Sequence, residues 1–218
     1  MKPFMFSPQK EQMRMSKVRK GRVSVALAIA SSATSVLADG HLLAVGVMLR
    51  ASNLPVYHKF VDLAGGSDAA KIVIFPTASG SLGSSKRFQA ELVALGVPAS
   101  HVTIASIDSK NYAQTMNDPE AVRPITEASA VWFVGGDQAR IAKALFNADG
   151  SDSLAMQAVR KVYEQGGVIG GTSAGASILG AQTPTAYGVV MDTLDFGVAK
   201  SAGQRGAALL KGSGLFKG

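Results

Sequence analysis

The chain has 218 residues, of which 47% are hydrophobic and 17% charged, a composition typical of a globular domain rather than of a disordered segment. It contains no cysteine, which excludes disulfides, thiol nucleophiles and cysteine-bound metals. The net charge is +7, but residues 1–38 hold seven Lys or Arg and one Glu, whereas residues 39–218 hold 15 basic and 14 acidic residues. No basic field therefore covers the folded part, and nucleic acid is not an expected partner.

The first 38 residues have the pattern of an export signal. A basic segment at 17–22 precedes the uncharged stretch 23–36, and Ala38 stands where a signal peptidase would cut. A membrane anchor needs about 20 apolar residues, which this Ser-, Thr- and Ala-rich stretch does not provide. We predict an N-terminal extension and signal peptide at 1–38, a single domain at 39–218, and a periplasmic or secreted protein with no membrane contact after cleavage.

Predicted strands and helices alternate between residues 41 and 179, the strands from apolar or β-branched runs and the helices from apolar residues at helical spacing. The expected strands are 41–48, 71–75, 101–107, 130–134 and 167–171, the first of them buried on both faces. The expected helices are 55–63, 86–95, 120–127 (interrupted by Pro124), 138–146, 153–165 and one that starts at 174. This alternation predicts an α/β fold with a mostly parallel sheet flanked by helices.

The pattern weakens after Gly180. A strand at 187–190 is the one further element that we expect, because residues 197–218 contain several glycines and little periodicity. A compact domain rarely ends in such a stretch. We therefore expect the fold to be incomplete at its C-terminus.

A serine lies on a predicted strand-to-helix turn. Residues 171–175, Gly-Thr-Ser-Ala-Gly, have the form G-x-S-x-G and follow the apolar pair Val168-Ile169. In this context the glycines permit a sharp turn that exposes the hydroxyl of Ser173. The N–H groups at the start of the following helix would face a developing oxyanion. A tight turn whose small residues serve only packing is the alternative.

Residues 135–138, Gly-Gly-Asp-Gln, end another predicted strand. The carboxyl ends of parallel strands meet at one edge of the sheet, where ligands bind in open α/β folds. Gly136 could bring its N–H close to a substrate carbonyl and complete an oxyanion hole with the N–H of Ala174, while Gln138 could bind a polar substrate group. Asp137 is expected to cap the next helix. The segment 76–79 ends a third strand and would line the same edge.

Together, residues 71–79, 131–141 and 166–176 resemble the successive signatures of the cyanophycinase family of serine peptidases, which is related to peptidase E, an aspartyl dipeptidase. The similarity covers roughly residues 41–180. It implies a fold like that of class I glutamine amidotransferases. It also implies hydrolysis of peptide bonds that follow aspartate in cyanophycin, a polyaspartate with arginine on each side chain, to β-Asp-Arg dipeptides through an acyl-enzyme.

The resemblance also assigns roles to single residues. It makes Ser173 the nucleophile, Gly136 and Ala174 the oxyanion donors, and Gln138 a substrate contact. Asp192 or Asp195 would be the acid of the triad, with Asp192 preferred. No cofactor is implied, no metal site is expected because no cluster has ligand spacing, and the partner is an Asp- and Arg-containing peptide or polymer. Dimers are common in such families, so a homodimer is also considered.

The base that the serine requires is missing from the sequence. The histidine of the family lies downstream of the serine, but His41, His58 and His101 all precede Ser173 and none matches the motif. We expect that the sequence stops short of this histidine, or that the protein is an inactive homologue that binds the substrate. An esterase of the α/β-hydrolase type, which shares G-x-S-x-G, is a further alternative.

Overall fold

The computed structural model of the protein describes residues 40–187, 192–199 and 204–216. Five parallel strands form one sheet in the order β1-β5-β4-β2-β3. The strands in this order are His41–Val45, Val168–Thr172, Ala130–Phe133, Ile72–Phe75 and Val102–Ile104. The predicted α/β fold with a mostly parallel sheet between helices is confirmed.

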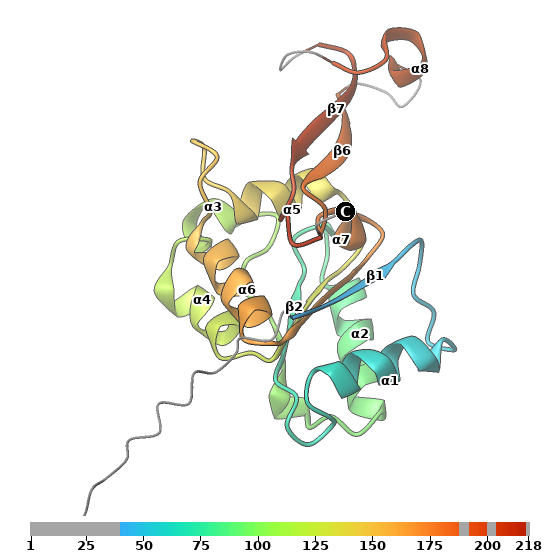
Figure 1. Ribbon diagram of the computed structural model, residues 1–218, viewed down its shortest axis with the longest axis vertical. Helices are drawn as coiled ribbons and strands as arrows, with labels where there is room; N and C mark the ends of the chain where they lie inside the picture. Colours follow the sequence, from blue (N-terminus) through green and yellow to red (C-terminus); the bar gives the residue numbers. More distant parts are fainter. Residues whose placement is uncertain (1–39, 188–191, 200–203, 217–218) are drawn as a thin grey trace, which may run out of the picture. The chain divides into compact units, whose positions relative to one another are not determined.

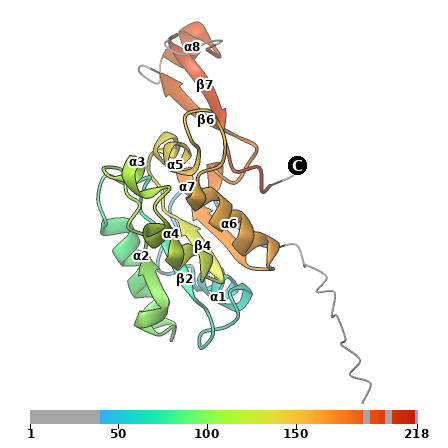
Figure 2. The same ribbon diagram turned by 90° about the vertical axis from the view of Figure 1, so that its left-hand side faces the viewer.

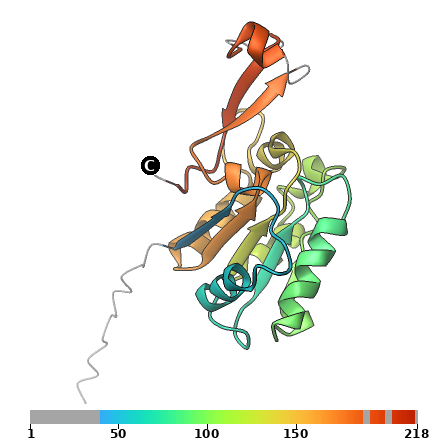
Figure 3. The ribbon, with the colours of Figure 1, turned by 90° about the vertical axis from the view of Figure 1, so that its right-hand side faces the viewer.

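Helices cover both faces of this sheet (Figure 1). Helices α1 (Leu54–Leu63) and α2 (Gly83–Ala94) lie on one face, and α4 (Pro119–Thr126) and α6 (Leu154–Glu164) lie on the other. Figures 2 and 3 look at these two sides in turn. The remaining helical segments are η1 (Ala99–His101), α3 (Tyr112–Thr115), α5 (Gln138–Leu145), α7 (Ala174–Ser177) and α8 (Asp192–Phe196).

The central strands β2 and β4 lie deepest in the core. All four residues of β2 and all four of β4 are buried, as expected of apolar runs that receive helices on both faces. The prediction that the first strand is also buried on both faces is wrong. Strand β1 ends at Val45, lies at one end of the described sheet beside β5 alone, and is half-buried or exposed along its length.

The predicted interruption at Pro124 is also wrong, because α4 continues through this residue to Thr126. A proline inside a helix removes one backbone hydrogen bond and crowds the preceding turn. In α4 the buried side chains of Val122 and Ile125 hold the helix in place despite that loss. Asp118 caps its first turn by accepting a hydrogen bond from the N–H of Glu120 at 3.1 Å.

An antiparallel hairpin that the sequence pattern did not indicate follows α7. Strand β6 (Gln182–Tyr187) pairs with β7 (Gly206–Lys211), from Gln182 opposite Lys211 to Tyr187 opposite Gly206. We expected a strand to start at residue 187, which is wrong because β6 already starts at Gln182. Residues 188–190 of the expected strand lie outside the described residues. The expectation of no regular structure after residue 197 is corrected by β7. The hairpin and α8 are drawn in orange and red in Figure 1.

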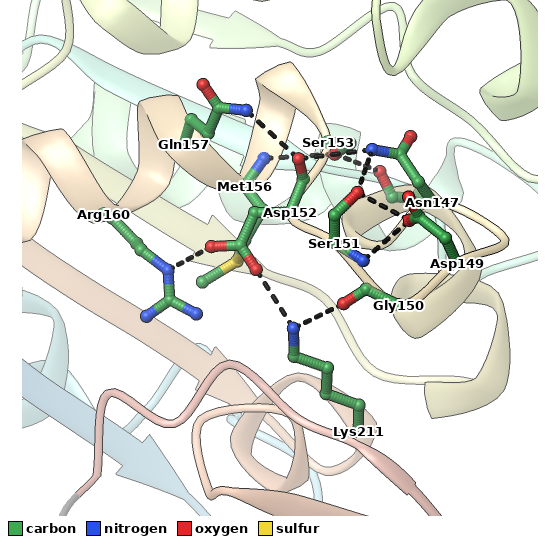
Figure 4. A network of polar contacts seen from close by, with 11 residues as sticks. Asn147, Asp149, Gly150, Ser151, Asp152, Ser153, Met156, Gln157, Arg160 and Lys211 are labelled. Carbon is green, nitrogen blue, oxygen red and sulfur yellow. Dashed lines mark hydrogen bonds and ion pairs between the residues drawn. The ribbon is translucent and has the colours of Figure 1, made fainter.

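A polar network holds the end of β7 against the loop between α5 and α6 (Figure 4). Lys211 Nζ donates to the carbonyl oxygen of Gly150 at 2.7 Å and lies 3.3 Å from Asp152 Oδ1. The ammonium group also lies 4.4 Å from the centre of the Phe146 ring. The second carboxylate oxygen of Asp152 accepts from Arg160 Nε at 2.5 Å. Two cations thus share one carboxylate at the base of the hairpin.

We expect Asp152→Asn to destabilise the protein by about 1–2 kcal/mol at pH 7, since hydrogen bonds to charged groups contribute that much when partly buried. Burial by itself would raise the pKa of Asp152, but the hydrogen bond and charge of Arg160, with Lys211, hold it below its ordinary value of 3.8. The contribution is therefore complete above about pH 5 and is lost as the pH falls through the lowered pKa.

Urea unfolding at neutral and acidic pH measures this effect. Asp68→Asn, at an exposed position, is the matched control and should change the stability by less than about 0.5 kcal/mol. A loss for Asp152→Asn that is equally large at pH 7 and well below pH 4 would show that charge is not what holds the network together.

Candidate active site

Ser173 occupies a sharp turn between β5 and α7. Its backbone has φ 54° and ψ −116°, and among the described residues it is the one non-glycine residue with a positive φ. Such a conformation costs about 1–3 kcal/mol and persists only where the surroundings hold it. Here the N–H of Ser173 donates to the carbonyl oxygens of Val45 at 3.0 Å and Gly46 at 2.8 Å, both at the end of β1. The predicted strand-to-helix turn is confirmed.

The glycines of G-x-S-x-G allow the backbone to fold tightly onto itself. A Cβ atom on Gly171 would collide with the backbone of Gly175, and one on Gly175 would collide with the carbonyl group of Phe133 in β4. Thr172, between Gly171 and Ser173, donates its hydroxyl hydrogen to the carbonyl oxygen of Val47 at 2.7 Å. The turn is therefore hydrogen-bonded to the end of β1 and the residues just after it, and its backbone packs closely against β4.

The segments that end β2, β4 and β5 meet around this turn, as the sequence predicts. An added Cβ on Gly135 would lie 3.3 Å from Ser173 Cβ, which places the end of β4 beside the serine. Gly136 has φ +146°, and a Cβ there would collide with the carbonyl of Ala78, in the segment after β2. The N–H of Asp137 donates to that same carbonyl oxygen at 3.0 Å.

A cavity of about 290 Å³ opens next to Ser173. Its polar part includes Ser173, Thr172 and the two glycines of the β4 turn. Its apolar part is contributed by the β1–α1 loop and by aromatic side chains from the layer between the sheet and helices α1 and α2. The lining residues are Val47, Met48, Leu49, Tyr57, Ser84, Arg87, Phe88, Trp132, Val134, Gly135, Gly136, Thr172 and Ser173.

The aromatic wall of the cavity is continuous with the core. The Phe88 ring stacks on Trp132 with the ring centres 4.4 Å apart, and Tyr57 stacks on Phe88 at 5.5 Å. Trp132 is 1% exposed and lies over Gly170, where a Cβ would approach the indole ring to 2.6 Å. Burial above all, and then Glu91, raise the pKa of Tyr57, against the opposing charge of Arg87. The phenol therefore stays protonated at neutral pH.

The other predicted site residues take different places. Ala174 is the buried first residue of α7, so its N–H has no intrahelical acceptor. Together with Gly136 it lies at the serine turn, and the oxyanion role of both stays a prediction. Gln138 does not line the cavity. Its side-chain amide donates to the carbonyl oxygen of Pro184 in β6, so its role as a substrate contact also stays a prediction. Asp137 caps α5 as expected, accepting from the N–H of Ala139 at 2.9 Å.

The two candidate acids lie in α8. This helix follows Tyr187 and packs on β7, at the end of the hairpin opposite to the one that joins α7. The hairpin ladder has an extent of about 17 Å at strand spacing. Asp195 is exposed and does not line the cavity, whereas the side chain of Asp192 lies outside the described part. The assignment of Asp192 stays a prediction.

None of the three histidines, all within the described residues, lines the cavity beside Ser173. His41 is at the opposite end of β1 from Val45, about 13 Å along an extended strand. His58 is exposed on α1, and His101 ends η1 before β3, at the amino edge of the sheet. Within the described residues, the cavity beside Ser173 therefore has no imidazole that could act as its base.

The described residues also show two further absences. Within residues 40–187, 192–199 and 204–216, no cluster of three or more His, Asp or Glu side chains could hold a metal ion. In the same ranges, none of the helices has the length and apolar character that crossing a bilayer requires.

Sequence reasoning missed most of the cavity wall outside the two glycine-rich turns, including Tyr57 and Arg87. Both lie on helices whose apolar spacing predicts only that they cover the sheet. Neither belongs to a motif, and the positions of α1 and α2 on the sheet depend on tertiary packing. No local signal in the sequence could have placed them beside Ser173.

An α/β sheet with a serine on a strained strand-to-helix turn defines the class of proteins with a nucleophile elbow. Comparison with known families narrows the class: the model of peptidase family S51 matches residues 42–195, and the chain belongs to this family. The cyanophycinase group within the family is the finer assignment that the resemblance suggests.

Two solved structures are similar to the chain. A peptidase from an acI-B1 Actinobacterium is 25% identical with a TM-score of 0.48, and the match covers 67% of this chain and 59% of that one. A protein of Listeria monocytogenes EGD-e, provisionally described as peptidase E, is 15% identical with a TM-score of 0.53, covering 82% of this chain and 76% of that one. The second likeness supports the fold of the sheet and its helices.

Proposed function

We propose that this chain carries the nucleophile of an exported serine peptidase that cleaves peptide bonds following aspartate in cyanophycin-like polymers and releases β-Asp-Arg dipeptides. The observation that carries the proposal is the backbone of Ser173, held at φ 54° beside Gly135 and Gly136 in a chain of family S51. Strain of this kind collects at functional sites, which supports a functional role for Ser173.

The geometry supports acyl transfer in two steps. Ser173 Oγ attacks the carbonyl carbon of the substrate, and the carbonyl oxygen becomes an oxyanion that accepts hydrogen bonds from the N–H groups of Gly136 and Ala174. Collapse of the intermediate breaks the C–N bond, the amine leaves with a proton, and an ester to Ser173 remains. Water then attacks the ester, which releases the acid and restores the hydroxyl.

Each step needs a group that takes and returns a proton, and a positioned base contributes about 10²–10⁴-fold. Because no histidine of this sequence lines the cavity, free imidazole in the buffer should substitute for it in part. The proposal is therefore tested with the 218-residue chain in the presence and absence of imidazole.

The substrates are cyanophycin, a short aspartyl peptide and a short acyl ester, with product release followed by chromatography. Imidazole-dependent release of β-Asp-Arg from cyanophycin supports the proposal. Release from the aspartyl peptide alone supports a peptidase with a different substrate. Turnover of the ester without any peptide cleavage would instead indicate an esterase.

A second candidate is a binding protein that retains the cavity without catalysis. The placement of His41, His58 and His101 away from Ser173 favours it. Calorimetric binding of β-Asp-Arg dipeptide by the chain, with no turnover at any imidazole concentration, would support this candidate and overturn the first.

A further inference from the structure

A charged side chain lines the cavity of Ser173. Arg87 is on α2, its residue is exposed, and it lines the same cavity as Ser173 and Gly136. Ser84, one turn earlier on the helix, lines it as well and adds a hydroxyl. A guanidinium group and a serine nucleophile therefore share one pocket of about 290 Å³.

Arg87 has no acidic partner in the part of the chain that the structure describes. Other arginines show what a paired side chain looks like here: Arg123 lies 3.4 Å from Glu120, Arg140 lies 3.6 Å from Asp137, and Arg160 lies 2.5 Å from Asp152. Within the described ranges no carboxylate oxygen lies within 4.0 Å of Arg87, although Glu91 is one turn away on the same helix. The guanidinium is thus available to an anion that enters the cavity.

The wall of the cavity beside Arg87 is aromatic. Tyr57, Phe88 and Trp132 line it, and the rings of Tyr57 and Trp132 both stack on that of Phe88. Such a wall suits an apolar stem. A cation next to an apolar wall suits a ligand with a carboxylate at the end of a short carbon chain, because Arg binds carboxylates in a bidentate manner.

We propose that Arg87 binds a carboxylate of the substrate and determines specificity in the Ser173 site. This inference rests on the proposed function for the chemistry at Ser173 but not for the binding itself. A carboxylate reaches the pocket from one of two sources, an acidic side chain or a terminal α-carboxylate such as that of each side-chain arginine in cyanophycin. Arg87 is a positioning residue for the bound peptide and takes no part in the proton transfers.

The test measures binding without turnover. Calorimetry with the Ser173→Ala chain uses three short peptides of equal length: one with an acidic side chain and an amidated C-terminus, one with a neutral side chain and a free C-terminus, and one with neither carboxylate. We expect Arg87→Met to weaken the binding of at least one carboxylate peptide about tenfold or more, and to leave the neutral peptide unchanged. The affected peptide identifies the source of the carboxylate.

Matched variants separate charge from packing. Arg87→Lys should retain part of the affinity, Arg87→Glu should reverse the preference toward the neutral peptide, and Lys86→Met, at the exposed neighbouring position, should change nothing beyond about twofold. Equal binding of all three peptides by Arg87→Met and the parent chain would overturn the inference even if the chain hydrolyses peptides. Loss of hydrolysis with the binding pattern intact would instead count against the proposed function alone.

Discussion

Ser173→Ala is expected to reduce the imidazole-dependent hydrolysis of an aspartyl substrate to the rate of imidazole and buffer alone. The substitution removes the oxygen that forms the acyl-enzyme but keeps a Cβ atom at the strained backbone position. With imidazole as the base, the parent chain should exceed that background by at least about tenfold, because a positioned base contributes about 10²–10⁴-fold and a diffusing one only part of it.

The matched control is Ser177→Ala. Ser177 lies on the same short helix, α7, but its hydroxyl is paired with that of Thr183 at 2.7 Å and it does not line the cavity. Its loss should leave the imidazole-dependent rate within about twofold. Initial rates across a series of imidazole concentrations measure both variants. A Ser173→Ala chain that responds to imidazole like its parent would remove Ser173 from the mechanism.

Gly175→Ala is expected to destabilise the protein by about 2–3 kcal/mol. Helix propensity alone predicts the opposite, a gain of about 1 kcal/mol, since Gly175 is inside α7. The added methyl group, however, would collide with the backbone carbonyl of Phe133, which cannot rotate away because it belongs to the central strand β4. The collision outweighs the propensity, and the melting temperature should fall by about 4–10 °C.

Gly46→Ala provides the control for this experiment. Gly46 also lies close to the serine turn, through the hydrogen bond from the N–H of Ser173, but an added Cβ there meets no atom within 4 Å. Its stability should change by less than about 0.5 kcal/mol. Thermal unfolding followed by circular dichroism compares the two variants, and equal melting temperatures would show that the turn relaxes around the extra methyl group.

Much of the sheet could be predicted because each strand carries its own local signal. The runs Ile72–Phe75 and Ala130–Phe133 are apolar throughout and lie between turn residues, so both burial and strand limits follow from composition. Helix α6 shows the same consistency, since Ser153 caps it by accepting from the N–H of Met156 at 3.2 Å.

The hairpin β6–β7 could not be predicted in the same way. Its two strands lack clear alternation, β6 contains Pro184, and each is stabilised by pairing with residues 19 to 29 positions away. The anchor at its base, Lys211 with Asp152 and Gly150, joins residues about 60 positions apart, and no local pattern reports such a contact.

The residues of the candidate site differ in the same way: some have a local sequence signal and others do not. Ser173, Gly136 and Ala174 could be located because each follows a recognisable strand, and parallel strands bring their carboxyl ends together. Arg87 comes from the face of a covering helix, so its position depends on how α2 packs against Trp132 and Tyr57. Local sequence patterns do not predict packing of this kind.

Trp132 allows the cavity to be observed by fluorescence. It is the sole tryptophan of the chain, it is buried in the core, and it lines the cavity beside Ser173. Excitation of indole therefore reports on one place in the molecule, where the Phe88 ring stacks on it. A ligand that enters the pocket changes the surroundings of this single fluorophore, whereas unfolding exposes it to water and shifts its emission to the red. The protein thus carries an intrinsic probe that distinguishes occupancy of the pocket from melting of the core.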